Sequence, residues 1–261
     1  MMFDSHFHLT DPRLITEIDW QNQRPYGVEI GADFESLSTV FALAAEHDGI
    51  YCTAGVHPAY ADTYSANDFE NFVVTHLDDP KFVAIGECGL DYHREDLPDR
   101  EVQQRVFAHQ IALADKYAKP LVVHTREAWD DTVAILIAHR QQLKHGVLIH
   151  CMSYTAENAQ YLLRELSDVP LYFAFGGHIT HKNKSFLHDT LRVIPRDRIL
   201  IETDAPYLAP VPKRGEVNRP EYIQYTARQM ALLLNLTVDE VDELTRNNAL
   251  SFYQIKTAPV K

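Results

Sequence analysis

Eight short apolar runs recur along the chain, and each is followed by a segment long enough to hold a helix. The runs cover residues 3–9, 28–32, 50–56, 82–87, 121–124, 146–150, 171–175 and 199–203. Regular alternation of strand-like and helix-like segments is typical of βα units around a parallel sheet. Eight such units predict an α/β fold closed into a (β/α)8 TIM barrel, with a doubly wound open sheet as the alternative.

The segments between the runs carry apolar residues at spacings of three and four, which places them on one side of a helix. In residues 36–47, the apolar residues that share one face are Leu37, Val40, Phe41 and Ala44. Thr237 begins a capping-box match with Glu240, which predicts the start of a last helix. The proline-rich residues 206–220 predict one long loop, and such loops are often functional.

The chain length and the net charge limit the functions that this protein can have. The chain has 261 residues and is 46% hydrophobic, which fits one globular barrel domain over residues 1–261 with a sizeable core. Its formal net charge is −13, the wrong sign for broad, sequence-independent wrapping of nucleic acid. A phosphate-containing substrate would have to be attracted locally, by bound metal or by a small basic patch.

The cysteine pattern and the first residues indicate the compartment. Cys52, Cys88 and Cys151 form neither a disulfide framework nor a CxxC pair, and free thiols favour a reducing environment. The first residues do not resemble a signal peptide, and no apolar run approaches the roughly 18 residues of a membrane span. We expect a cytoplasmic protein with no membrane association and no stable protein partner.

Histidines and acids that can bind metal fall at the ends of five of the eight runs. These residues are His6 and His8, Glu87, His124, His150, and Glu202 with Asp204. Residues two apart in a strand point to the same face, and the carboxyl ends of barrel strands form the rim where active sites are built. We therefore expect these side chains to converge at one mouth of the barrel.

Each of these signals is weak by itself. Most His-x-His pairs are incidental, and a single histidine after an apolar run is usually a hydrogen-bonded core residue. The conjunction carries the prediction, because burying many titratable groups together is unfavourable unless they pair or bind cations.

The residue types narrow the metal. Imidazole and carboxylate without thiolate suit Zn, Mn, Fe, Ni or Mg. Six candidate ligands are too many for one tetrahedral ion: His6, His8, Glu87, His124, His150 and Asp204. We therefore expect two divalent ions, bridged by Glu87, at the separation of about 3.5–4 Å that is typical of two-metal sites. Strand alternation should turn Cys88 and Cys151 to the opposite face, as packing residues.

A set of segments in fixed order resembles the TatD family of metal-dependent deoxyribonucleases. The segments are Asp4-Ser-His6-Phe-His8, Gly55-Val-His57-Pro58, Ile85-Gly-Glu87-Cys-Gly-Leu-Asp91-Tyr92, His124-Thr-Arg126-Glu-Ala128, His150-Cys-Met-Ser and Glu202-Thr-Asp204-Ala-Pro-Tyr-Leu-x-Pro210. They extend from the first residues to Asn247-Asn-Ala249. The resemblance implies an amidohydrolase-type barrel and a deoxyribonuclease that acts as an exonuclease, with single-stranded DNA or DNA ends as the substrate.

The resemblance also implies a role for each matched ligand. His6, His8 and Asp204 would hold one ion, His124 and His150 the second, and Glu87 would bridge them. Two positions depart from the family pattern. After His150 the chain reads Cys-Met152-Ser-Tyr154, where Tyr154 stands in place of a small residue and would narrow the substrate pocket, and Glu127 stands where Asp is common.

The predicted pair of divalent ions suggests a mechanism. Two divalent ions would lower the pKa of a bound water, which would attack the phosphodiester, while the metals stabilise the charge that develops. Asp204 and Glu87 are the candidate catalytic residues, with Asp204 orienting the water and accepting its proton. Glu202 is expected either to support a ligand from outside the metal shell or to form a hydrogen bond in the core.

Substrate contacts are assigned to a histidine and to basic residues. His57 is expected either to contact the scissile phosphate or merely to form a His-Pro turn. Arg126 would clamp a phosphate through two hydrogen bonds. Basic residues in the loops after the seventh and eighth runs would provide a local positive patch: Lys182, Lys184, Lys213 and Arg214.

Three other interpretations remain open on the sequence alone. A metal-dependent hydrolase of C–N or ester bonds would use the same ions to polarise a carbonyl. Some barrels of that type bridge their metals with a modified lysine, whereas residues 82–90 contain no Lys and present Glu87. A non-catalytic binding module would be expected to have lost ligands. In the third interpretation, the histidines bind no metal and are polar residues of the core.

Overall fold

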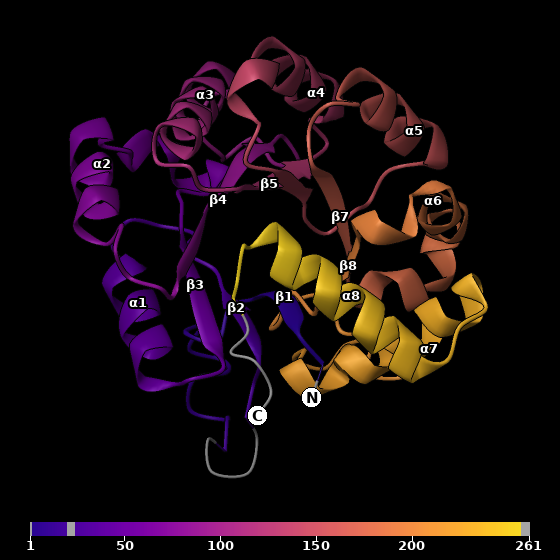
Figure 1. Cartoon of the computed structure of the whole chain (residues 1–261). Helices are drawn as coiled ribbons and strands as arrows, with labels where there is room; N and C mark the ends of the chain where they lie inside the picture. Colours follow the sequence, from indigo (N-terminus) through magenta and orange to yellow (C-terminus); the bar gives the residue numbers. More distant parts are fainter. Residues whose placement is uncertain (1, 20–23, 257–261) are drawn as a thin grey trace.

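The computed structural model describes residues 2–19 and 24–256, and its strands form one parallel sheet in chain order, β1 to β8 (Figure 1). The strands are β1 (Asp4–Phe7), β2 (Gly27–Glu29), β3 (Ile50–Ala54), β4 (Phe82–Asp91), β5 (Leu121–Arg126), β6 (Val147–Ile149), β7 (Leu171–Phe175) and β8 (Ile199–Ile201). This order confirms the predicted (β/α)8 TIM barrel and rules out a doubly wound sheet, in which the strand order reverses.

Helices surround the strands. The α-helices are α1 (Leu37–Glu46), α2 (Ala66–Thr75), α3 (Arg100–Lys116), α4 (Trp129–Ala138), α5 (Ala156–Glu165), α6 (Leu187–Val193), α7 (Ile223–Leu234) and α8 (Val238–Phe252). Short 3₁₀ helices are η1 (Pro58–Thr63), η2 (Arg140–Gln142), η3 (Gly177–Thr180), η4 (Lys182–Lys184), η5 (Arg196–Arg198) and η6 (Pro220–Tyr222). The helix predicted over residues 36–47 is α1, and the capping box at Thr237 is present, with its Oγ accepting from the Glu240 amide at 3.2 Å.

The fourth strand is longer than predicted. It was expected over residues 82–87, but it continues to Asp91 because residues 88–91 pair with β5, for example Asp91 with Arg126. Gly86 permits this path at φ +129°, and an added Cβ would lie 2.5 Å from the carbonyl oxygen of Val122. The backbone of β4 therefore approaches β5 closely just where Glu87 enters the barrel.

Hydrogen bonds join β1 and the residue after it to the segment that follows β8. The amide of Asp204 donates to the carbonyl of His6 at 2.9 Å, and the amide of His8 donates to Ala205 at 2.8 Å. Below them, the Asp4 carboxyl group binds both the amide and the hydroxyl of Thr203, at 2.9 and 2.5 Å. These contacts hold the first strand against the end of the last one, and so bring His6 and His8 close to Asp204.

The barrel interior has an apolar layer and a polar layer. The apolar layer packs against the end of α8, which crosses the strands in Figure 1, and includes Phe3, Val28, Val122, Leu148, Ala174, Leu200, Phe252 and Tyr253. The polar layer lies next to it along the strands. It includes His150 and Glu202, which lie two residues beyond Leu148 and Leu200 and therefore point to the same face of the sheet. A second apolar cluster fills the space between strands and outer helices. In the described part of the chain, no helix has the length and apolar character that a membrane crossing requires.

Candidate metal centre

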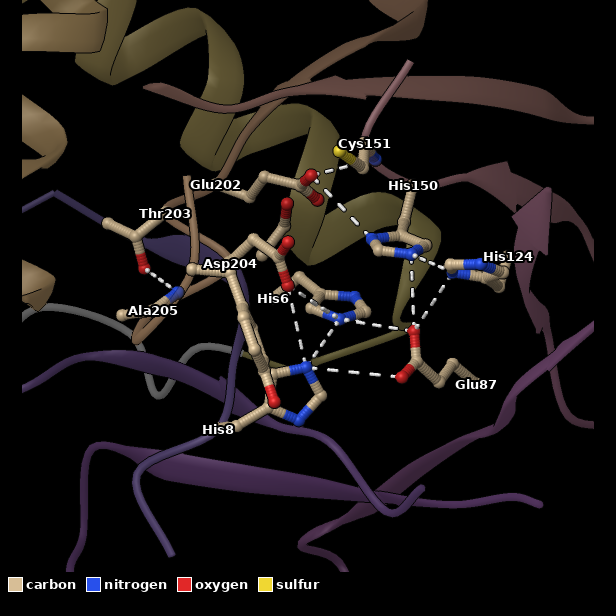
Figure 2. A network of polar contacts seen from close by, with 12 residues as sticks. His6, His8, Glu87, His124, His150, Cys151, Glu202, Thr203, Asp204 and Ala205 are labelled. Atoms are coloured by element: carbon tan, nitrogen blue, oxygen red, sulfur yellow. Dashed lines mark hydrogen bonds and ion pairs between the residues drawn. The ribbon is translucent and has the colours of Figure 1, made fainter. Parts of the chain in front are cut away.

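The two histidines of β1 and its following loop point into one polar space. Their Nε2 atoms lie 3.3 Å apart, and His6 is fully buried. Figure 2 shows both rings directed toward Glu87 and Asp204, as expected for residues two apart at a strand end. The two nitrogens can share one hydrogen bond when one ring is the Nε2–H tautomer, and two Nε2 lone pairs at this spacing can instead bind one cation.

Glu87 lies at the centre of the group, and each of its oxygens faces a different set of partners. Oε1 lies 4.0 Å from Nε2 of His8, and Oε2 lies 3.5 Å from Nε2 of His6. Oε2 is also 3.1 Å from Nε2 of His150 and 3.9 Å from Nδ1 of His124. A single carboxylate thus lies between two pairs of imidazoles (Figure 2).

The second pair of imidazoles comes from the ends of β5 and β6. Nδ1 of His124 and Nε2 of His150 are 3.2 Å apart. The ring of His150 also stacks on that of His6, with centroids 3.9 Å apart and planes 8° from parallel. The two pairs are therefore adjacent and share one buried space.

Asp204 completes the group on the side of His8. Its Oδ1 lies 3.5 Å from Nε2 of His8 and 3.8 Å from Nε2 of His6. Asp204 follows β8 in the left-handed backbone region, at φ 56°, which aspartate tolerates better than most residues. This conformation belongs to the tight turn in which the Tyr207 amide donates to the Asp204 carbonyl at 2.7 Å.

These spacings fit metal ligation. Bonds of about 2.0–2.1 Å place neighbouring tetrahedral ligands about 3.3 Å apart. The measured separations between donor atoms, 3.3 Å within the first pair and 3.2 Å within the second, are of that size. Two of the atom groups that can hold a cation are His6, His8 with Glu87, and Glu87, His124 with His150. These two groups contain five of the six sequence-predicted ligands, and the sixth, Asp204, lies beside them at 3.5 Å from Nε2 of His8.

The electrostatics of the group are those of a strongly coupled cluster. Burial and the neighbouring His150 hold the pKa of His6 well below its usual value. Burial opposes charging of His8, but Asp204 and Glu87 outweigh it and raise the pKa of His8 to about 9. Burial acts against ionisation of Glu87 too, yet the surrounding histidines hold the pKa of that carboxyl group well below its usual range. An anionic carboxylate at this centre suits a cation site.

Two further carboxylates contact the outer sides of the second histidine pair. Oδ2 of Asp91 lies 3.1 Å from Nε2 of His124. Oε1 of Glu202 lies 3.7 Å from Nδ1 of His150 and accepts the amide of Cys151 at 2.7 Å. Glu202 therefore accepts a hydrogen bond from the backbone and also lies beside a candidate ligand.

His57 lies next to the same pair. Its ring centroid is 4.3 Å from that of His124, while its Nδ1 accepts the amide of Ala59 at 3.0 Å and caps η1. Burial and the neighbouring His124 lower the pKa of His57 to about 3. His57 is thus both a turn residue and a neutral imidazole beside the centre.

The expected basic contacts lie farther out. Arg126 is exposed at the end of β5, two residues beyond His124. Lys182 and Arg214 are exposed in the segments after β7 and β8. The structure places these residues on the rim.

The residues that depart from the family pattern occupy different environments. Met152 is fully buried and belongs to the core. Tyr154 is half-buried, packs on Trp129 with ring centroids 4.5 Å apart, and has its hydroxyl 3.2 Å from that of Thr125. Cys88 is a packing residue as expected, whereas Sγ of Cys151 lies 3.9 Å from Nδ1 of His178.

Sequence reasoning missed three buried residues that shape the centre. Asp91 was noted within a longer segment, but nothing in the sequence pattern singled out its contact with His124. Glu29 accepts the amides of Leu9 and Thr10, at 2.7 and 2.9 Å, and so fixes the loop after His8. Asn218 donates to the carbonyls of Thr203 and Tyr207. Glu29 is a charged residue inside the apolar run 28–32, and that position was the available signal for it.

Comparison with known proteins agrees with this geometry. The model of the family described as TatD related DNase matches residues 3–254. The chain belongs to the TatD family. It is 35% identical to the uncharacterized metal-dependent hydrolase YabD of Bacillus subtilis, over 98% of this chain and 100% of that protein. It is 32% identical to the 3'-5' ssDNA/RNA exonuclease TatD of Enterobacter lignolyticus, over 88% of this chain and 90% of that protein.

A solved TatD homologue has the same fold. The crystal structure of YJJV from Escherichia coli superposes with a TM-score of 0.88 and 25% identity, covering 98% of both chains. Family membership over nearly the whole chain makes this protein a metal-dependent hydrolase of the TatD family.

Proposed function

We propose that this TatD-family hydrolase is a deoxyribonuclease that cleaves phosphodiester bonds in single-stranded DNA or at DNA ends, with two divalent ions. His6, His8 and Asp204 would hold one ion, and His124 and His150 the other. Glu87 would bridge them. The observation that carries this proposal is the position of the Glu87 carboxylate between the two imidazole pairs.

In the proposed reaction, the metal ions and the protein side chains have different roles. When bound, two such ions polarise a phosphoryl oxygen and make a water more acidic. Asp204 lies at the edge of the group, with Oδ1 3.5 Å from Nε2 of His8. From there its carboxylate can orient a water and accept the proton that the water loses. Asp91 would hold the ring of His124 through its 3.1 Å contact with Nε2, and Glu202 faces Nδ1 of His150 at 3.7 Å.

Substrate recognition would be local. The chain's net charge of −13 disfavours nucleic acid at long range, so the metals and a few donors must attract the phosphate. We assign the phosphate contacts to His57, which lies beside His124, and to Arg126, two residues beyond His124 on β5. The rim residues Lys182 and Arg214 would contact the strand farther from the reaction. The activity of the Enterobacter lignolyticus relative on ssDNA and RNA supports a single-stranded substrate.

The test is a substrate panel with purified protein and defined metal content. The panel contains single-stranded DNA, double-stranded DNA, single-stranded RNA, a β-aspartyl dipeptide and a lactone, each with Zn, Mn, Mg, Ni or Fe. We expect the highest kcat/KM on DNA, with release of nucleotides. Preferential cleavage of the dipeptide or the lactone would instead establish hydrolysis of C–N or ester bonds. Preferential cleavage of RNA would show that RNA, and not DNA, is the substrate.

A further inference from the structure

Exposed apolar side chains gather around the mouth of the barrel. The large apolar residues most exposed in the described structure are Phe34, Tyr60, Val74, Tyr161, Phe186, Tyr207, Leu208, Val211, Val217 and Leu232. Seven of these ten follow strand ends, and only Val74, Tyr161 and Leu232 lie on outer helices. The enrichment is therefore on the face that carries the candidate metal centre.

Tyr207 is the member of this set that reaches the centre. Its ring centroid lies 5.9 Å from that of His8, with the ring planes at 82°. The residue nevertheless remains 47% exposed. An aromatic ring in direct contact with a candidate metal ligand, and half open to solvent, is positioned to meet the group attached to a metal-held phosphate.

The backbone around Tyr207 is firmly held. The side-chain amide of the fully buried Asn218 donates to the carbonyl oxygens of Thr203 and Tyr207, at 2.8 and 2.6 Å. The Asn218 amide also donates to the carbonyl of Pro206 at 3.1 Å. Residues on both sides of the exposed ring are thus tied together, so the ring is presented from a fixed loop.

Arg13 covers part of the ring from another segment of the chain. Its guanidinium carbon lies 4.6 Å from the centroid of Tyr207. Asp11 holds the same guanidinium through two hydrogen bonds, at 2.8 and 2.7 Å. Cation and ring therefore form one layered surface, here called the Tyr207–Arg13 platform, whose Arg13 side chain is itself partly exposed.

We propose that the Tyr207–Arg13 platform stacks a nucleobase next to the scissile phosphate, so that the enzyme binds the end of an unpaired strand through its base. This inference rests on the proposed nuclease function. Aromatic rings and guanidinium planes are the surfaces on which unpaired bases stack without sequence preference. A base that is still paired and stacked within a duplex is not free to occupy the platform, so the platform would favour single strands.

The proposal is tested with two oligonucleotides of one sequence, one intact and one lacking the bases of its last two nucleotides at the degraded end. The variants are Tyr207→Ala, Tyr207→Phe and Tyr161→Ala. Tyr161 is the matched control, because it is 41% exposed and lies under Arg164 at 5.1 Å, but on the outer helix α5. Loss of a stacked base is expected to lower kcat/KM of Tyr207→Ala on the intact strand by about 5- to 150-fold.

The abasic strand separates stacking from a structural role. On it, Tyr207→Ala is expected to match the wild type within about twofold, since no base is present to stack. Tyr161→Ala should match the wild type on both strands, and Tyr207→Phe, which keeps the ring, should lose much less activity than Tyr207→Ala on the intact strand. An equal loss on both strands, or no loss on the intact one, would overturn the proposal.

A second measurement does not depend on turnover. Binding is followed with 2-aminopurine as the terminal base of a strand whose last linkage cannot be cleaved. Its fluorescence should be quenched by the wild type and Tyr161→Ala, but not by Tyr207→Ala. Quenching without hydrolysis of any DNA would refute the nuclease function and leave the base site standing. DNA hydrolysis with undiminished quenching by Tyr207→Ala would refute the base site and leave the nuclease function standing.

Discussion

Nε2 of His124 lies 3.1 Å from Oδ2 of Asp91, whereas Nδ1 of the same ring faces His150 at 3.2 Å and Glu87 at 3.9 Å. A carboxylate that accepts the Nε2 proton fixes the tautomer of the ring and leaves the lone pair on Nδ1. That lone pair then points toward the space between Glu87 and His150. Asp91 is therefore a positioning residue that acts through His124.

The first prediction concerns Asp91→Asn. An amide cannot replace the negative charge behind His124, so affinity for divalent metal should fall about 10- to 100-fold. Titration of metal-free protein with Zn or Mn measures this. Asp131→Asn is the matched control, because Asp131 accepts the Tyr92 hydroxyl at 2.9 Å close by but contacts none of the six candidate ligands. Equal metal affinity in Asp91→Asn and the wild type would contradict the assigned role.

The second prediction concerns the candidate ligands themselves. Asp204→Asn should lower kcat by about 10²- to 10⁴-fold, because the amide cannot accept a proton from water. His124→Ala should abolish hydrolysis through loss of a ligand to the second ion. Both variants should keep the circular dichroism spectrum of the wild type, since neither residue belongs to the apolar layer of the barrel. Full activity in either variant would remove the two-metal mechanism.

The arrangement of the ligands was predictable because it follows from parallel topology. Once His6, Glu87, His124, His150 and Asp204 are assigned to strand ends, a barrel brings those ends to one mouth. The barrel itself followed from the period of the apolar runs. The predicted end of β4 was wrong, because the Cys-Gly-Leu-Asp sequence after Glu87 lacks the apolar alternation of a strand and is held by pairing with β5.

Contacts between distant side chains were not predictable. Asp91 with His124, Asn218 with Tyr207, and Arg13 on Tyr207 each join residues whose separation carries no periodic signal. Such contacts depend on how the loops fold over the rim, and loops of this length can adopt many alternative conformations. Sequence therefore specified which residue types reach the centre, but not what holds them or surrounds them.

The third prediction concerns metal removal. Chelation should abolish activity, and added divalent metal should restore it. Metal that binds only the folded chain stabilises it by about 2.7 kcal/mol at 100 times its Kd. For a chain of this size the thermal midpoint should rise by roughly 5–10 °C on metal addition. An identical midpoint with and without metal would contradict binding at the buried cluster.

The fourth prediction concerns pH and His178, which is buried and has its Nε2 2.8 Å from the carbonyl of Met152. Burial lowers the pKa of His178 from 6.5 to about 4. The unfolded chain therefore binds a proton below pH 6.5 that the folded chain does not, so stability is full above that pH and falls as the pH drops toward 4. Between pH 7 and pH 5 this residue should remove roughly 2 kcal/mol from the free energy of unfolding.

The variant His178→Gln isolates that effect. Glutamine keeps a donor for the Met152 carbonyl but does not titrate. Chemical denaturation of metal-free protein at pH 7 and pH 5 should show a smaller loss of stability in the variant than in the wild type. The same loss in both proteins would show that His178 does not contribute.

The central claim is that two cations share the Glu87 carboxylate. Anomalous diffraction from crystals grown with Mn or Zn tests it most directly. The account predicts two anomalous peaks per chain, about 3.5–4 Å apart, one beside His6 and His8 and the other beside His124 and His150. A single peak in the cluster, or peaks only elsewhere on the molecule, would contradict it.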